Sequence, residues 1–430
     1  MTQDKTNILT AIDVGTTKVC TIIGKVSGPK DIQILSFSIV PSDGLSKGNV
    51  TNIASTEKAI RESVEDARRK AGVSVTSAHV GLTGAHVTFE NRRDDLPWAV
   101  ERGVITADDL SQVPERVAAA SNGVGREVIH ALPMSYSVDG HEGIRNPLGM
   151  HSRHLEVETH IVSGETSYID KLVRAVEGSG LDVASLVLEP LASSEAVLTQ
   201  QEKEQGVALV DIGGGTTDVV VFKNGAMQFT SVIPVGGYQF TNDICTTYNT
   251  PYEAAESVKL RYGHTDPYSA SSNYEITLPL VGRTSEVKVS HREICQLMRE
   301  RAQELGRLIK LNLRESEFGD VTKLRLVLTG GTSNLPGLHL LMQQMLTNRV
   351  RIGVPHSHMS IPDELREPEY ATSIGILLWA AGHRDSANAR SAERNVAVVE
   401  QNGNSIVARF IKQIKMYLPT QIFSLKRGRV

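Results

Sequence analysis

The fold is decided by residues 207–222, which read VALVDIGGGTTDVVVF. An apolar run predicts a buried strand that ends at Asp211, and a second apolar run begins at Asp218. Three glycines and two threonines lie between the two strands. This pattern predicts a β-hairpin whose tip exposes several backbone N–H groups, because glycine lets the backbone approach other atoms closely.

The glycine-rich tip has two interpretations. Successive backbone amides can form a concave nest that wraps a phosphate, and Asp211 and Asp218 can hold a divalent ion directly or through its waters. The same residues are also compatible with an ordinary tight hairpin that contains a glycine bulge. Residues 207–222 alone leave both interpretations open.

The same pattern occurs near the start of the chain. Residues 8–20, ILTAIDVGTTKVC, contain an apolar strand that ends at Asp13 and a Gly-Thr-Thr turn before a returning strand. A further strand is predicted after each hairpin, over 31–40 and over 226–235, so the two halves indicate an internal repeat. Two such hairpins that face each other across a cleft would grip a polyphosphate from both sides. The sequence therefore favours nucleotide binding.

The composition is that of an ordinary globular protein. Of 430 residues, 40% are hydrophobic and 22% are charged, and this length accommodates two or more domains. A formal net charge of −4 gives no general reason to expect a nucleic-acid partner. Three widely spaced cysteines argue for a reducing compartment and against a disulfide framework. No signal-peptide pattern and no membrane-spanning apolar run is found, so the body is expected to be cytoplasmic.

Two features of the first half accompany its hairpin. A helix is predicted over 56–71, capped by Ser55 or Thr56 and ended by Gly72. Residues 85–162 contain short alternating runs rich in His, Arg, Glu and Gly, which predict a small inserted α+β subdomain.

Three other stretches carry candidate site residues. Glu189, at a predicted strand-to-helix junction, can reach into the cleft and position a water, or it can only cap the helix. Glu256 and Lys259 share one face of a predicted helix, where they form either a surface ion pair or a clamp for a ribose. A third strand and glycine turn, over 324–338, can lie along an adenosine, and an apolar helix over 370–381 is a candidate hinge.

The composition changes again near the end of the sequence. Residues 384–404 are polar and predict a flexible linker. Residues 406–418, IVARFIKQIKMYL, predict an amphipathic helix with an apolar and a basic face. The residues of these two faces are Ile406, Phe410, Ile411, Ile414, Tyr417 and Leu418, and Arg409, Lys412 and Lys415. Such a helix indicates a membrane-surface anchor, and the alternative is a helix docked on the body.

These features together resemble a known family. The hairpins, the Gly330-Gly331-Thr332 turn and the split layout resemble the actin-like ATPase fold of actin, heat-shock chaperones and sugar kinases. That α/β fold has two lobes with repeated sheet and helix cores around a nucleotide cleft. The stretches TAIDVGTTKVC, SAHVGLTGAHV, PVGGYQFTNDI and EAAESVKLRYG, with the terminal helix, are similar to the bacterial cell-division FtsA family. The resemblance covers essentially the whole chain.

The resemblance implies subdomain boundaries and site residues. The implied subdomains are 1A (1–85 and 163–205), 1C (86–162), 2A (206–242 and 321–383) and 2B (243–320), followed by the linker and a membrane-targeting tail (405–430). Mg²⁺ would lie near Asp13 and Asp211, which would hold it through water. Phosphate would be held by Gly15, Thr16, Thr17 and Lys18 on one side and by Gly213, Gly214, Gly215, Thr216 and Thr217 on the other. The nucleoside would contact Gly237, Glu256, Lys259, Gly330, Gly331 and Thr332.

The resemblance also implies a function. Such proteins bind ATP, form filaments on the inner membrane through anionic lipids, and tether the tubulin-like FtsZ ring by its C-terminal peptide. That peptide would dock near Arg301 and Glu304, and other division proteins would bind 1C. The protein is therefore expected at the cytoplasmic face of the membrane, at the septum. ATP hydrolysis, if any, would be slow, with Glu189 as a candidate catalytic group.

Two other functions share this fold. A small-molecule kinase would need a catalytic aspartate and a sugar pocket, and the sequence identifies neither. A pilus-assembly actin relative would share the hairpins but is not expected to carry a basic terminal helix. The tail of this chain departs from the family pattern, because it contains Pro419 and lacks tryptophan.

Overall fold

The computed structural model describes residues 8–28, 31–101, 103–121, 123–270, 274–316, 321–356 and 360–383. The predicted linker (384–404) and the amphipathic tail, with every membrane residue named above, lie outside these ranges. None of the described helices is long and apolar enough to cross a bilayer.

Two five-stranded sheets repeat one strand order. The first runs β11-β6-β1-β2-β3 and consists of β1 (Ile8–Val14), β2 (Lys18–Gly28), β3 (Asp31–Pro41), β6 (Ser77–Leu82) and β11 (Asp182–Leu188). The second runs β14-β13-β12-β17-β18 and consists of β12 (Val207–Ile212), β13 (Thr217–Lys223), β14 (Ala226–Ile233), β17 (Arg325–Thr329) and β18 (Val350–Ile352). In each sheet a three-stranded antiparallel meander is extended by two parallel strands. The predicted internal repeat is therefore confirmed.

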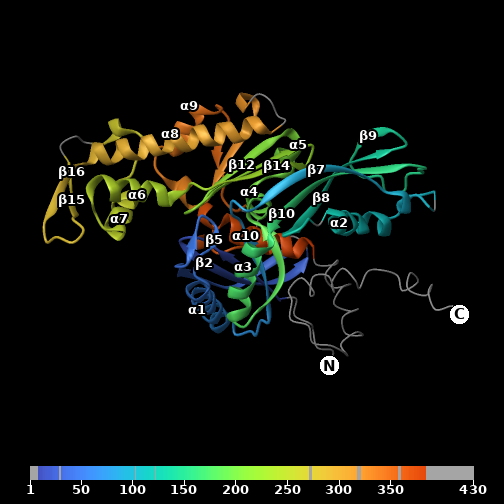
Figure 1. Cartoon of the computed structure of the whole chain (residues 1–430), viewed down its shortest axis with the longest axis horizontal. Helices are drawn as coiled ribbons and strands as arrows, with labels where there is room; N and C mark the ends of the chain where they lie inside the picture. The colour runs from blue at the N-terminus through green and yellow to red at the C-terminus, as the bar shows by residue number, and fades with distance from the viewer. Residues whose placement is uncertain are drawn as a thin grey trace.

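Two helices pack between the sheets. α4 (Glu189–Val197) and α10 (Ala371–Gly382) share one buried apolar cluster with strands of both sheets. The two helices cross so closely that a Cβ on Gly375 would lie 1.8 Å from the carbonyl oxygen of Ala192. Figure 1 shows both helices at the centre of the molecule. This position lets side chains at the start of each helix reach the hairpins of both lobes.

Further helices cover the outer faces of the two sheets. α1 (Ile53–Ala71) and α3 (Thr166–Gly178) share an apolar cluster with the first sheet. The second sheet packs with α6 (Gly237–Tyr248), α7 (Tyr252–Tyr262), α8 (His291–Glu315) and α9 (Leu338–Met345). The shorter elements are β4 (Leu45–Ser46), β5 (Asn49–Val50), α5 (Gln200–Gln205), β15 (Glu275–Pro279) and β16 (Glu286–Ser290).

The first helix begins three residues before its predicted start. Asn52, rather than Ser55 or Thr56, is the capping residue, and its side-chain oxygen accepts a hydrogen bond from the Ser55 N–H at 3.1 Å. The Thr56 hydroxyl donates to the Asn52 carbonyl at 2.8 Å and so belongs to the first turn. Gly72 ends the helix in the left-handed region, as predicted.

The chain between β6 and α3 forms the predicted α+β insert. Its sheet has the order β7-β10-β8-β9, with β7 (Thr88–Asp95), β8 (Arg126–Val138), β9 (His141–Ile144) and β10 (Leu155–Glu165). α2 (Ala107–Ser121) packs on this sheet in a separate apolar cluster that includes Val113 and Leu155. Figure 1 places the insert at the opposite end of the molecule from β15 and β16.

Candidate functional site

The tips of the β1–β2 and β12–β13 hairpins have the same backbone turn. In the first tip the Gly15 N–H donates to the Lys18 carbonyl at 2.9 Å, and in the second the Gly213 N–H donates to the Thr216 carbonyl at 2.9 Å. Each turn follows a strand that contains a buried aspartate two residues before the glycine. Each half therefore supplies the same unit, a buried carboxylate beside a four-residue loop.

The two tips face each other and touch. A Cβ on Gly214 would lie 2.6 Å from Cγ2 of Thr17, and a Cβ on Gly215 would lie 2.5 Å from Oγ1 of Thr16. Heavy atoms at such distances overlap, so the missing side chains let the tips approach. The glycines of the second tip are needed for contact with the first.

A cleft of about 440 Å³ lies between the two tips and the third glycine turn. This volume is within the range of small-molecule sites. The predicted residues that line the cleft are Asp13, Gly15, Thr16, Thr17, Lys18, Glu189, Asp211, Gly213, Gly214, Thr216, Gly237, Glu256, Lys259, Gly330, Gly331 and Thr332. Residues separated by more than three hundred positions in the sequence, such as Asp13 and Gly330, therefore meet in one cleft.

Two of the predicted phosphate residues are not among those that line the cleft. Gly215 packs against Thr16 and the backbone nitrogen of Lys47. Thr217 already belongs to β13, and its fully buried hydroxyl donates to the carbonyl of Val235 at 2.8 Å. The Thr217 side chain therefore joins β13 to the segment that follows β14 and does not line the cleft.

Hydroxyl groups orient the aspartates at the floor of the cleft. Ser373 donates to Oδ2 of Asp13 at 2.7 Å. Oδ2 of Asp211 accepts from Ser193 at 2.7 Å and from Thr372 at 2.9 Å. Because α10 carries both Thr372 and Ser373, the start of this one helix contacts the aspartates of both hairpins.

Four carboxylates are crowded at this floor. Burial raises the pKa of Asp13 to about 6 and that of Asp218, which accepts a hydrogen bond from Thr83, to about 7. Burial also raises the pKa of Asp211, while burial followed by the charges of the three aspartates raises that of Glu189. Oxygen ligands of this kind suit Mg²⁺, and a bound cation would offset the repulsion among them.

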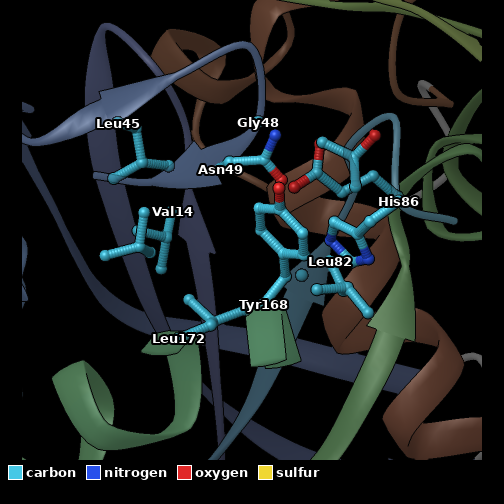
Figure 2. A pocket seen from close by; sticks show the side chains of 12 residues that line it. Val14, Leu45, Gly48, Asn49, Leu82, His86, Tyr168 and Leu172 are labelled. Carbon is cyan, nitrogen blue, oxygen red and sulfur yellow. The ribbon is translucent and has the colours of Figure 1, made fainter. Parts of the chain in front are cut away.

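Glu189 lies between the cleft and a smaller cavity. It is the first residue of α4, and the capping position itself is occupied by Leu188. The second cavity has a volume of about 10 Å³, which fits one water, and Glu189 lines both spaces. Figure 2 shows Asn49, His86 and Tyr168 around this cavity, with the His86 and Tyr168 rings stacked at 4.8 Å. Glu189 therefore lines the cleft and is not the N-cap residue of α4.

Glu256 and Lys259 of α7, the pair predicted to contact the ribose, form hydrogen bonds with α6. Lys259 Nζ lies 2.7 Å from Oε2 of Glu256 and donates to the Thr241 hydroxyl at 3.0 Å. Thr241 in turn donates to Glu256. The third glycine turn is also held in place, because the Thr332 hydroxyl donates a hydrogen bond to the Gly213 carbonyl of the second tip at 2.8 Å. The Glu256–Lys259 pair is therefore part of the cleft wall and not a loose surface ion pair.

The predicted partner-binding residues lie on α8, away from the cleft lining. Arg301 makes a two-pronged ion pair with Asp243 of α6, with both distances at 2.6 Å, and also pairs with Glu304 at 2.6 Å. The Arg301 side chain is only 21% exposed, whereas that of Glu304 is 51% exposed. Arg301 therefore joins α8 to α6, and Glu304 presents its carboxylate to solvent.

The sequence did not identify several residues that line the cleft. These are Gly48, Thr83, Tyr238, Phe240, Tyr252, Leu260, Glu369 and Thr372, together with Val14 and Asp218 beside the tips. Asn334, Leu335 and Pro336 also line the cleft and belong to the stretch 324–338 that was predicted to lie along an adenosine. Asp218 was recognised as a possible ion ligand but not as a site residue. For Glu369 and Thr372, the available signal was a polar start, EYATS, on an otherwise apolar helix.

These features define the class of the protein as actin-like. The structure is similar to that of the PilM-PilN type IV pilus biogenesis complex, with a TM-score of 0.59, 17% identity, and coverage of 87% of this chain and 98% of that one. It is also similar to MreB5 of Spiroplasma citri bound to ADP, with a TM-score of 0.52, 14% identity, and coverage of 90% and 98%. At these identities the similarity establishes the fold, which is actin-like with an α+β insertion.

The sequence comparisons identify the family. Residues 208–375 match the family described as cell division protein FtsA, and residues 84–163 match the SHS2 domain inserted in FtsA. Cell division protein FtsA of Pseudomonas aeruginosa is 36% identical over 86% of this chain and 89% of its own length. The proteins of the same name from Neisseria meningitidis and Escherichia coli K12 are 32% and 30% identical, each over 96% of this chain and over 99% and 97% of their own lengths. The chain belongs to the FtsA family of cell division proteins.

Proposed function

We propose that this protein is an ATP-binding adaptor of cell division that polymerises on the inner face of the cytoplasmic membrane and tethers the FtsZ ring to it. The observation that carries the nucleotide part is the cleft of about 440 Å³ between two facing glycine turns. Its chemistry matches Mg·ATP: backbone amides and Lys18 for phosphate, carboxylates for the cation, and a fixed Glu256–Lys259 pair for the ribose. MreB5 of Spiroplasma citri, a fold neighbour, is described as bound to ADP in one structure and to AMPPNP in another.

Within this proposal the cleft residues have distinct roles. Asp13 and Asp211 hold Mg²⁺ through its waters, and the metal screens the phosphate charge. The tips hold phosphate by their backbone N–H groups. Glu189 positions a water for slow hydrolysis, which its place at the cleft supports. We assign the boundaries 1A (1–85 and 163–205), 1C (86–162), 2A (206–242 and 321–383) and 2B (243–320) as part of the same proposal.

The membrane and partner functions complete the proposal. The basic amphipathic tail binds anionic lipid, the FtsZ C-terminal peptide docks on α8 near Glu304, and later division proteins bind the insert. Filament formation brings many tails to one membrane, which multiplies a weak individual affinity. Family membership supports this assignment, which places the protein at the septum on the cytoplasmic face of the membrane.

The nucleotide part is tested by titration with a fluorescent ATP analogue. We expect full-length protein to bind in the presence of Mg²⁺ and to bind more weakly when EDTA removes the metal. Equal affinity with and without Mg²⁺ would contradict the metal role of the aspartates. Absence of binding under both conditions would contradict the nucleotide role of the cleft.

The tether is tested by co-sedimentation with anionic liposomes and Mg·ATP. Full-length protein is expected in the pellet, and a chain that ends at residue 384 is expected in the supernatant. The double variant Lys412→Gln/Lys415→Gln keeps the apolar face and should bind roughly thirtyfold more weakly, because each basic residue contributes about 1 kcal/mol. If both the full-length and the truncated chain stay in the supernatant, the tail is not a membrane anchor.

A further inference from the structure

Lys18 already has an anionic partner within the protein. This residue ends the first tip, begins β2 and lines the cleft. Its ammonium nitrogen lies 3.1 Å from Oε2 of Glu369 and 3.9 Å from the centre of the Tyr370 ring. The nitrogen is shielded from solvent and, within the described part of the chain, makes no hydrogen bond of good geometry. Lys18 therefore has N–H donors left for another anion.

Glu369 reaches Lys18 from the other side of the cleft. It belongs to the short 3-10 helix Pro368–Tyr370, which is fastened to the third glycine turn. The Gly330 N–H donates to the Pro368 carbonyl at 3.1 Å, and the Thr329 hydroxyl donates to the same carbonyl at 3.2 Å. The ion pair thus joins the first sheet to a segment held by the second. Glu369 also lines the cleft, with 37% of its side chain exposed.

We propose that Glu369 pairs with Lys18 when the cleft holds no nucleotide, and that a nucleotide phosphate displaces it. The inference rests on the proposed nucleotide binding. A phosphate and a carboxylate are both anions that require N–H donors, so they compete for the same shielded ammonium group.

Displacement of Glu369 would act on a helix that contacts both hairpins. Glu369 lies three and four residues before Thr372 and Ser373, whose hydroxyls hold Asp211 and Asp13. The same segment, residues 369–373, therefore contacts the lysine of one tip and the aspartates of both hairpins. Phosphate binding would be sensed at the start of α10, where the two lobes meet.

The test is a titration with a fluorescent ATP analogue and Mg²⁺, comparing wild-type protein with Glu369→Gln. The glutamine keeps the shape of the side chain and removes the competing charge, so ATP should bind about three- to tenfold more tightly. Glu369→Ala, which cannot contact Lys18 at all, should also bind ATP more tightly. Glu367→Gln is the matched control, because it removes the same charge from an exposed position two residues earlier that does not line the cleft.

A second readout separates competition from a change in the shape of the cleft. Adenosine has no phosphate, so its affinity, measured by displacement of the ATP analogue, should be the same in wild-type protein and Glu369→Gln. Tighter ATP binding with unchanged adenosine binding would support the inference. If the wild-type protein binds ATP but both Glu369 variants bind it equally or more weakly, the inference is overturned and the proposed nucleotide binding stands. If the wild-type protein does not bind ATP, the proposed function fails and the inference fails with it.

Discussion

The two hairpin tips have the same backbone turn but opposite side-chain content. The first tip, Gly15 to Lys18, presents two hydroxyls and an ammonium group, whereas the second, Gly213 to Thr216, presents three glycines and one hydroxyl. One tip therefore offers charge and the other offers close approach. The comparison shows that a repeated unit need not be used twice in the same way, because contact between two tips requires that one of them lack side chains.

The strands beside the tips differ as well. In register, Asp13 faces Cys20 across the first hairpin, whereas Asp211 faces Asp218 across the second. Burial raises the pKa of the Cys20 thiol to about 12, so that group is neutral where the Asp218 carboxyl can ionise. The second hairpin thus supplies two acids to the cleft floor, and the first supplies one.

The largest effect is expected from filling the space between the tips. Gly214→Ala would place a methyl group 2.6 Å from Cγ2 of Thr17, so the tips must separate and ATP affinity should fall about a hundredfold. Thr17→Ser removes that Cγ2, so the double variant should recover most of the affinity. Gly213→Ala is the control, because its nearest neighbour would lie at an ordinary 3.4 Å. Equal losses in the two single alanine variants would contradict contact between the tips as the cause.

A smaller effect is expected from removing the extra acid of the second hairpin. Asp218→Asn should lower the Mg²⁺ dependence of ATP binding, measured as the affinity ratio with and without EDTA, by about tenfold. The equivalent position in the first hairpin provides the control, and Cys20→Ala should leave this ratio unchanged. If Cys20→Ala changes the ratio as much as Asp218→Asn, the two hairpins are not different in metal binding.

The same difference predicts how the stability of the nucleotide-free protein depends on pH. Asp13 and Asp218 have folded-state pKa values raised to about 6 and about 7, so the folded state binds more protons than the unfolded chain above pH 4. Their stabilising contribution is complete below pH 4 and is lost as pH rises through 6 to 7. In EDTA, the free energy of unfolding should therefore fall by about 1–2 kcal/mol from this source between pH 6 and pH 8.

Asp218→Asn provides the control for this pH dependence. Denaturant unfolding of this variant should give a flatter profile over the same range, because one of the two titrating carboxyls is gone. A profile as steep as that of the wild-type protein would show that Asp218 does not titrate in this range.

The smallest effect concerns the hydroxyls that hold the two aspartates. Asp13 accepts from Ser373, whereas Asp211 accepts from both Ser193 and Thr372. Ser373→Ala should lower the free energy of unfolding by about 1 kcal/mol. Thr372→Val should cost less, because Ser193 still donates to Asp211. Chemical denaturation of both variants measures the difference, and a greater loss for Thr372→Val would reverse the expected order.

The sequence determined the parts of this protein that depend on neighbouring residues. The strands that carry Asp13 and Asp211, the glycine turns, the repeat and the inserted unit all follow from short-range patterns, because period and turn chemistry act over a few residues. Each of the two strands ends one residue later than predicted, at Val14 and Ile212. The sequence predicted the residues that line the cleft where these residues belong to the glycine turns. Thr217 was misplaced because its neighbours suggest a loop, whereas pairing with β14 puts its hydroxyl inside the sheet.

Only the tertiary structure decided which distant groups meet. Ser373 reaches Asp13 across 360 positions, and Thr372 reaches Asp211 across 161. Glu369 meets Lys18, and Arg301 meets Asp243, through packing of helices against sheets and against each other. Such contacts leave no local pattern, because each residue is compatible with its own helix whether or not its partner is present. They depend on how α10 and α8 pack, which the whole apolar core fixes.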